Sequence, residues 1–279
     1  MMVIKPYWNT VKRAIATVIV FAVLIIYLFP LYWMGLTSLE SVSTILRFPP
    51  KLVPTIAHWS NYLHALTALP FDRYFANTFE IAIFEVVGAV FSSALFGFAF
   101  ARLRARGKNV LFLLVLGGLM LPYTVVMIPQ YLLFRDLGWI NTYLPLIVPG
   151  YFGLPFLIFL FRQFYSSIPQ ELYDAAMVDG CGYLGLFWRV TIPLSKPVLI
   201  AAVIFNLTAV WNDFLPQLIY INSSSKDTVA LGLASFTASY GSSPWNLLMA
   251  ASLTVAMVPI LAFVFGQNQL LNGIVVTMK

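Results

Sequence analysis

Three polar side chains, Asn206, Asp213 and Gln217, interrupt the apolar run 198–221. If the run is one helix, the offsets of 7 and 11 residues from Asn206 return to within about 20° of one direction, since each residue turns the helix by about 100°. We therefore expect a polar stripe, with the helix loosened at Pro216. The stripe indicates either the wall of a hydrated pathway for hydroxyl-rich ligands or a hydrogen-bonded seam against a partner subunit.

Two further acids, Glu80 and Glu85, lie in the apolar run 75–101. Because they are five residues apart, they point about 140° from each other on a helix and do not form a paired-carboxylate site. Glu85 is expected near the middle of the membrane, where it is protonated, paired or facing water. We favour a structural role for both acids over proton coupling.

The segment 162–197 is long and amphipathic, and prolines and glycines divide it into short elements. It is the place where another protein is expected to bind. Pro169 favours a helix start, and Glu171 and Asp174 suit the positive end of that helix. The alternative is an ordinary amphipathic connector that lies on the bilayer.

The same segment has signals for a reversal of the chain. Gly180 together with Gly182 can end the first helix in a left-handed turn. A second short helix is expected over 183–190, ended by Pro193. The segment thus predicts a helix-turn-helix.

Sequence patterns of enzymes are absent. The sequence contains no G-x-x-x-x-G-K-[ST], no G-x-G-x-x-G after a strand, no H-E-x-x-H and no G-x-S-x-G. His58 and His64 lack neighbouring ligands for a metal, and the single cysteine, Cys181, reads as a packed residue. We expect no enzyme activity and no cofactor bound by this chain.

The elements that carry these residues are membrane spans. Of the 279 residues, 61% are hydrophobic and only 9% are charged, whereas soluble domains average about 45 to 50% and about 25%. The apolar residues gather into six runs near the length that crosses a bilayer. The runs are 14–34, 75–101, 110–134, 143–161, 198–221 and 245–265. This predicts an all-α integral membrane protein of six transmembrane helices, whose first run lacks a signal-peptide cleavage site and should be retained.

Basic residues set the expected orientation. Six spans place both termini on one side, and that side carries 11 of the 16 Lys and Arg residues. They are Lys5, Lys12, Arg13, Arg102, Arg104, Arg106, Lys108, Arg162, Arg189, Lys196 and Lys279. Both termini are therefore expected to be cytoplasmic. The net charge of +6 indicates topology and affinity for membrane lipid headgroups, not nucleic-acid binding.

These patterns divide the chain into consecutive regions. The first three are a cytoplasmic N-terminus (1–13), a first transmembrane helix (14–36) and an external loop (37–73) that is expected to fold as a short cap. A five-helix core (74–272) containing the loop 163–197 and a cytoplasmic tail (273–279) follow.

The segment that ends at Pro197 closely resembles the EAA motif of ABC importer permeases. It reads Glu171-Leu-Tyr-Asp174-Ala175-Ala176-Met-Val-Asp179-Gly180, then nine residues, then Val190-Thr-Ile192-Pro193-Leu194. Asp174 stands where the family usually has Glu, and Val190 and Ile192 replace Ile and Leu, so charge and apolar character are kept.

The resemblance extends to the carbohydrate-uptake branch of these permeases, and within it to the maltose-type second subunit. The similar stretches are Phe29-Pro-Leu-Tyr-Trp33, Asn61-Tyr62, Tyr74-Phe-Ala-Asn77, Leu121-Pro122, Ile128-Pro129, Trp211-Asn212-Asp213-Phe214 and the tail from Gln269 to Lys279. They occur in order and at the expected distances from the spans.

The resemblance implies that the loop couples the chain to an ATPase. The coupling residues would be Glu171, Asp174, Ala175, Ala176, Asp179, Gly180 and Pro193. The alanines would let a partner approach the backbone closely, Gly180 would allow a sharp reversal, and Asp174 would offer a charge to an Arg or Lys of the partner.

The resemblance further implies a multi-pass subunit of the prokaryotic inner membrane. With a homologous permease it would form the pathway for a sugar delivered by an external solute-binding protein, while two separate ATPase subunits carry ATP and Mg. The alternative, a proton-coupled secondary transporter acting through Glu80, Glu85 or Asp213, lacks a second, inverted set of spans. A membrane-embedded enzyme would need a cluster of catalytic acids or a metal motif, and none is visible.

Overall fold

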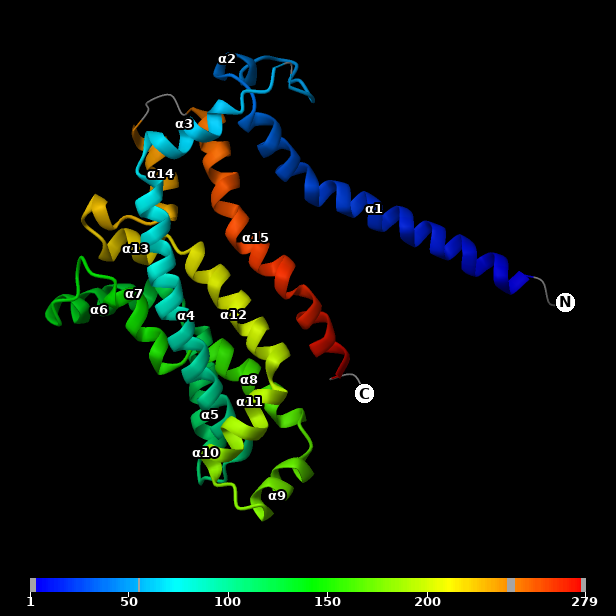
Figure 1. Cartoon of the computed structure of the whole chain (residues 1–279), viewed down its shortest axis with the longest axis vertical. Helices are drawn as coiled ribbons and strands as arrows, with labels where there is room; N and C mark the ends of the chain where they lie inside the picture. Colours follow the sequence, from blue (N-terminus) through cyan, green and yellow to red (C-terminus); the bar gives the residue numbers. More distant parts are fainter. Residues whose placement is uncertain (1–3, 55, 240–243, 277–279) are drawn as a thin grey trace. The chain divides into compact units, whose positions relative to one another are not determined.

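The computed structural model describes residues 4–54, 56–239 and 244–276, and all regular secondary structure in these ranges is helical (Figure 1). Contacts divide the chain into two compact units. Unit 1 is Met1–Leu69 with Ser235–Val255, and unit 2 is Pro70–Ala234 with Ala256–Lys279. The helical architecture confirms the predicted fold class.

Unit 1 contains α1 (Ile4–Ser38), α2 (Val42–Ile45) and α3 (Ser60–Ala68). The Nδ2 of Asn61 donates to the carbonyl oxygens of Ser38 and Glu40, at 2.9 and 3.0 Å. The hydroxyls of Ser38 and Tyr62 lie 2.9 Å apart. These bonds tie α3 to the end of α1, so the segment between them is folded, as expected for a cap. It is shorter than the predicted loop 37–73, because the next helix already begins at Phe71.

Unit 2 is the larger bundle, and α14 (Val229–Ser239) and α15 (Trp245–Val276) run through both units. Its other helices are α4 (Phe71–Arg102), α5 (Lys108–Gly117), η1 (Gly118–Met120), α6 (Tyr123–Asp136), α7 (Leu144–Ile147), η2 (Val148–Phe152), α8 (Pro155–Ser167), α9 (Gln170–Val178), α10 (Tyr183–Gly185), η3 (Leu186–Thr191), α11 (Ile192–Leu194), α12 (Lys196–Trp211), α13 (Leu215–Tyr220) and η4 (Ser224–Lys226). The predicted tail 273–279 is helical to Val276, and its last three residues lie outside the described ranges.

The core of unit 2 lies where α4 packs beside α8 and α12 (Figure 1). Small residues allow this close packing, as is usual between helices in a membrane. A Cβ added to Gly97 would lie 2.5 Å from the Cβ of Phe161 and 3.0 Å from the backbone N of Arg162. The core continues through Phe98 to Tyr173 of α9 and Phe187 of η3. The α9 to α11 segment therefore shares its core with the membrane bundle, at one end of unit 2 (Figure 1).

Among the described residues, four helices are long and apolar enough to cross a membrane, and two bent pairs bring the number to six. The four are Lys12–Ser38, Phe71–Arg102, Leu144–Ser167 and Trp245–Gln269. The pairs are Lys108–Met120 with Tyr123–Asp136, bent by 99°, and Tyr183–Leu194 with Lys196–Trp211, bent by 81°.

The expected single helix over 110–134 is wrong. The chain leaves η1 in an extended conformation at Leu121 and begins α6 at Tyr123. Pro122 explains the break, because it has no N–H and pushes the residue before it out of the helical conformation.

The expected single helix over 198–221 is also wrong. α12 ends at Trp211, and the chain begins α13 only at Leu215. Asn212 helps to end α12, since its Nδ2 donates to the carbonyl oxygen of Thr208 at 2.8 Å. Pro216, the second residue of α13, has no N–H to continue the ladder. The stripe geometry that places Asn206, Asp213 and Gln217 on one helix therefore does not hold.

Candidate coupling segment and polar residues of the bundle

The first helix of the coupling segment, α9, begins as the sequence predicts. Pro169 lies at its N-cap with φ −55° and ψ 138°, and Glu171 lies in its first turn. The acidic side chain suits the positive end of the helix. Glu171, Asp174 and Ala175 are exposed, whereas Ala176 is half-buried against the core. Of the two alanines, only Ala175 is exposed.

The end of α9 is a left-handed turn at Gly180, whose φ is +84°. The N–H of Gly180 donates to the carbonyl of Met177 at 3.0 Å, and the N–H of Cys181 donates to the carbonyl of Ala176 at 2.9 Å. This pair of bonds is the Schellman motif. The predicted turn is thus confirmed at Gly180. It is wrong at Gly182, whose φ of −75° any residue can adopt.

Pro193 does not end the second helix, contrary to expectation. The helical run continues from α10 through the π-helix η3 and through α11 to Leu194. The π-helix explains why the proline is tolerated. The N–H of Ile192 bonds to the carbonyl of Phe187, five residues back, and this wider turn accommodates Pro193, which has no N–H to donate. The run ends at Ser195, whose hydroxyl donates to the carbonyl of Thr191.

The inner face of α9 is anchored by Tyr173, which is 1% exposed. Its ring packs near Phe98 of α4, with centroids 6.5 Å apart, and its hydroxyl lies 3.0 Å from the hydroxyl of Thr191 in η3. Phe98 in turn packs against Phe187 at 5.4 Å. Tyr173 therefore packs α9 against both α4 and the π-helix.

The outer face of α9 and α10 combines exposed acids with exposed apolar side chains. Asp179 is exposed like the acids within α9. Val178 is 89% exposed and Leu184 is 71% exposed, with Leu172 at 46%. These apolar side chains lie beside the exposed acids in the sequence, so α9 and α10 offer both kinds of side chain to solvent. The acids are predicted from the sequence, whereas the apolar residues are not, although their positions beside the motif are visible in the sequence.

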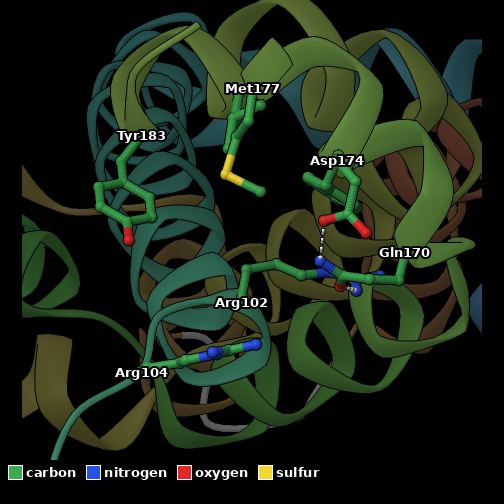
Figure 2. Close-up of a pocket in the computed structure, with 8 residues that line it drawn as sticks. Arg102, Arg104, Gln170, Asp174, Met177 and Tyr183 are labelled. Carbon is green, nitrogen blue, oxygen red and sulfur yellow. Dashed lines mark hydrogen bonds between the residues drawn. The ribbon is translucent and has the colours of Figure 1, made fainter.

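Arg102, the last residue of α4, connects α4 to the start of α9 (Figure 2). Its guanidinium donates to the carbonyl oxygens of Tyr165 and Ile168 and, at 2.8 Å, to the Oε1 of Gln170. The Nε2 of Gln170 donates to the Oδ1 of Asp174 at 2.9 Å. Neither Arg102 nor Gln170 is predicted as a site residue from the sequence, where Arg102 contributes only to the charge bias of the terminal side.

Two of the polar residues expected in the pathway have partners within the bundle. The Nδ2 of Asn206 donates to the Oε2 of Glu85 at 2.6 Å, and both side chains are buried. Gln217, 1% exposed, accepts a hydrogen bond from the hydroxyl of Thr228. Glu85 is thus paired, one of the three states expected for it, and it joins α4 to α12.

Asp213 differs from both, because it lies in the break between α12 and α13 and is half-buried. Non-helical backbone at membrane depth is tolerated where it is buried in protein or lines a water-filled cavity. Glu80, by contrast, is exposed on α4.

The sequence of this chain is similar to those of known proteins. Residues 93–273 match the family described as "Binding-protein-dependent transport system inner membrane component". An arabinooligosaccharides transport system permease protein of Bacillus subtilis is 31% identical over 270 residues, covering 96% of this chain and 95% of the relative. An sn-glycerol-3-phosphate transport system permease protein of Rhizobium meliloti is 33% identical over 266 residues, covering 92% and 93%.

Solved structures agree in fold. A chain of a bacterial ABC transporter involved in the import of the acidic polysaccharide alginate superposes with a TM-score of 0.76 at 22% identity, over 91% of this chain and 94% of that chain. A chain of the alginate transporter in complex with an alginate pentasaccharide-bound periplasmic protein gives a TM-score of 0.67 at 14% identity, over 93% and 95%.

Proposed function

We propose, since the chain belongs to the family of binding-protein-dependent transport system inner membrane components, that it is a permease subunit of an ATP-driven ABC importer. With a homologous permease it forms the translocation pathway, an external solute-binding protein delivers the substrate, and two ATPase subunits that hold ATP and Mg drive the cycle. The observation that carries the proposal is the exposed acidic and apolar face of α9 and α10, on a helix whose inner face is locked into the membrane core.

This chain's part in the cycle is mechanical. The ATPase subunits supply the chemistry of ATP hydrolysis when they dimerise around the nucleotide. α9 receives their motion, Tyr173 transmits it to Phe98 of α4, and α4 moves with α8 because Gly97 holds the two backbones in contact. Packed cores switch between discrete arrangements, so a small shift at α9 can become a change of access in the bundle.

A sugar or oligosaccharide is the proposed substrate. The resemblance to the carbohydrate-uptake branch supports it, as do relatives named for arabinooligosaccharides and, in Streptomyces coelicolor, for diacetylchitobiose. These named substrates share many hydroxyl groups, which need hydrogen-bonding side chains along the pathway.

The orientation follows from the charge bias. We place both termini and the α9 to α11 segment on the cytoplasmic side of the inner membrane, the side expected to carry most Lys and Arg residues. The cap of unit 1 then faces outward, where a solute-binding protein would dock.

Within the pathway we assign the main polar role to Asp213. Asn206 and Gln217 are buried and bonded to Glu85 and Thr228, which fits the seam alternative for these two. Asp213 lies in a helix break, and broken membrane helices commonly form substrate sites in transporters.

Asp213→Asn is expected to lower sugar uptake moderately, and Asp213→Leu to lower it by about tenfold, since the leucine removes hydrogen-bonding capacity as well as charge. The measurement is uptake of labelled sugar into proteoliposomes holding the complete complex, with the co-purified ATPase as the control for assembly. Wild-type uptake by Asp213→Leu would remove Asp213 from the pathway.

The importer assignment is tested by co-expressing the chain with the homologous permease, the ATPase subunits and the solute-binding protein that are proposed as its partners. We expect a stable membrane complex whose ATPase activity rises several-fold with sugar-loaded binding protein, and uptake that stops without ATP. If uptake persists without ATP and collapses with a protonophore, the chain belongs to a proton-coupled transporter instead. In that case, substituting Glu85 or Asp213 should abolish uptake as the protonophore does.

A further inference from the structure

At the end of α4, the side chain of Arg102 contacts both α8 and α9. α8 ends at Ser167, and the last carbonyl groups of any helix lack partners within it. The guanidinium donates to two carbonyls at this end, those of Tyr165 and Ile168, where a cation is also favoured by the helix dipole. Arg102 therefore closes the end of α8 directly before the chain turns into α9.

The same guanidinium fixes the orientation of the Gln170 side chain (Figure 2). Because an arginine only donates hydrogen bonds, the amide oxygen of Gln170 must face Arg102. Its NH2 group then faces Asp174, to which it donates at 2.9 Å. The carboxylate that the partner is proposed to recognise is thus held by a chain of two hydrogen bonds that begins at the end of a membrane helix.

A third contact makes the arrangement rigid. The Arg102 guanidinium carbon lies 4.1 Å from the centre of the Tyr173 ring, which is a cation–π distance. Tyr173 and Gln170 lie on the same short helix, so Arg102 contacts α9 at two points. A helix contacted at two points cannot roll about its axis without breaking one contact.

We propose that Arg102 is a positioning residue for coupling: it fixes the roll of α9 and, through Gln170, aims the Asp174 carboxylate at the ATPase subunit. The inference rests on the proposed function. It extends that function, because the coupling surface is then set by a side chain about seventy residues away in sequence.

Lysine cannot replace arginine in this role. Its ammonium group is a compact point charge, whereas the planar guanidinium donates in several directions at once and stacks on an aromatic ring. Arg102→Lys keeps the charge and most of the volume, so the complex is expected to assemble, but the bond to Gln170 and the stack on Tyr173 are lost together.

The experiment uses the complete reconstituted complex and measures the ratio of binding-protein-stimulated to basal ATPase activity. Arg102→Lys is expected to lower this ratio by about tenfold, a change that corresponds to losing a hydrogen bond to a charged group. Gln170→Leu, at an exposed position, should give a similar loss. Arg106→Gln removes a charge at an exposed site in the connection that follows α4, four residues after Arg102, and should leave the ratio at the wild-type value.

The double variant Arg102→Lys with Gln170→Leu separates positioning from general structure. If Gln170 acts only through its bond to Arg102, the double variant loses no more than Arg102→Lys alone. Additive losses, or wild-type ratios in both single variants, would overturn the proposal. If the wild-type complex itself shows no stimulation, the importer assignment fails, and a stimulated wild type with unaffected variants removes only the role of Arg102.

Discussion

In complexes that carry Gly180→Val, we expect binding-protein-stimulated ATPase activity and sugar uptake to fall about 5- to 30-fold, while the amount of the chain in the membrane stays unchanged. Gly180 has φ +84°, which costs an L-residue about 1 to 2 kcal/mol and costs a β-branched residue more. Nothing lies within 4 Å of a Cβ placed there, so the loss comes from the backbone and not from crowding.

The physical consequence of the substitution is a rotated end of α9. A valine that leaves the left-handed region breaks the bonds from Gly180 to Met177 and from Cys181 to Ala176, which close the helix. Asp179 and Val178 then change direction on the proposed docking face. Membrane insertion depends on the apolar spans and is unaffected, so quantitative blotting of the membrane fraction is the companion measurement.

Two variants serve as matched controls for this substitution. Gly182→Val adds the same side chain two residues later, where φ is −75° and nothing lies within 4 Å of an added Cβ. Normal coupling is therefore expected. Gly180→Asn should retain most of the activity, because asparagine tolerates the left-handed conformation. If Gly180→Val couples as well as Gly182→Val, the turn is not part of the coupling mechanism.

The parts of the site that the sequence predicted are those governed by neighbouring residues. Pro169 at the start of α9 and Gly180 at its end act through their own backbone preferences, and both lie where expected. Four of the predicted apolar runs also overlap the helices of the described ranges that are long and apolar enough to cross a membrane, Lys12–Ser38, Phe71–Arg102, Leu144–Ser167 and Trp245–Gln269.

The parts that the sequence did not predict depend on distant residues or on competing local effects. The bond from Asn206 to Glu85 joins residues 121 positions apart, and the contacts of Arg102 span more than sixty. No periodicity within one segment indicates such pairs. At Pro193 the error was different, since a π-helix relieved the break that the proline alone would cause.

The helix break before Pro216 was half predicted. The sequence predicts a loosening at this proline, but the polar stripe requires a helix that continues through it. The break places Asp213 outside both helices and leaves Asn206 and Gln217 on different ones. An ionisable residue directly before a proline-containing turn in an apolar run is therefore better interpreted as part of a helix break.

Asp174→Lys is expected to lower the amount of ATPase subunit that co-purifies with the chain by about tenfold or more, because like charges facing each other across an interface cost several kcal/mol. The proposed partner residue is basic, and the acids of α9 are exposed. The new lysine would also lose the hydrogen bond from Gln170 and would lie in the same cavity as Arg102 and Arg104.

Two further substitutions decide whether the charge at position 174 is the cause. Asp174→Glu keeps the charge and is the residue usual in the resembling family, so co-purification should remain near the wild-type level. Asp136→Lys reverses the charge of an exposed aspartate on α6, outside the coupling segment, and should leave ATPase binding unchanged. Equal ATPase yields from Asp174→Lys and wild type would mean that α9 is not held by charge, and docking would then have to rest on the apolar side chains of Leu172, Val178 and Leu184.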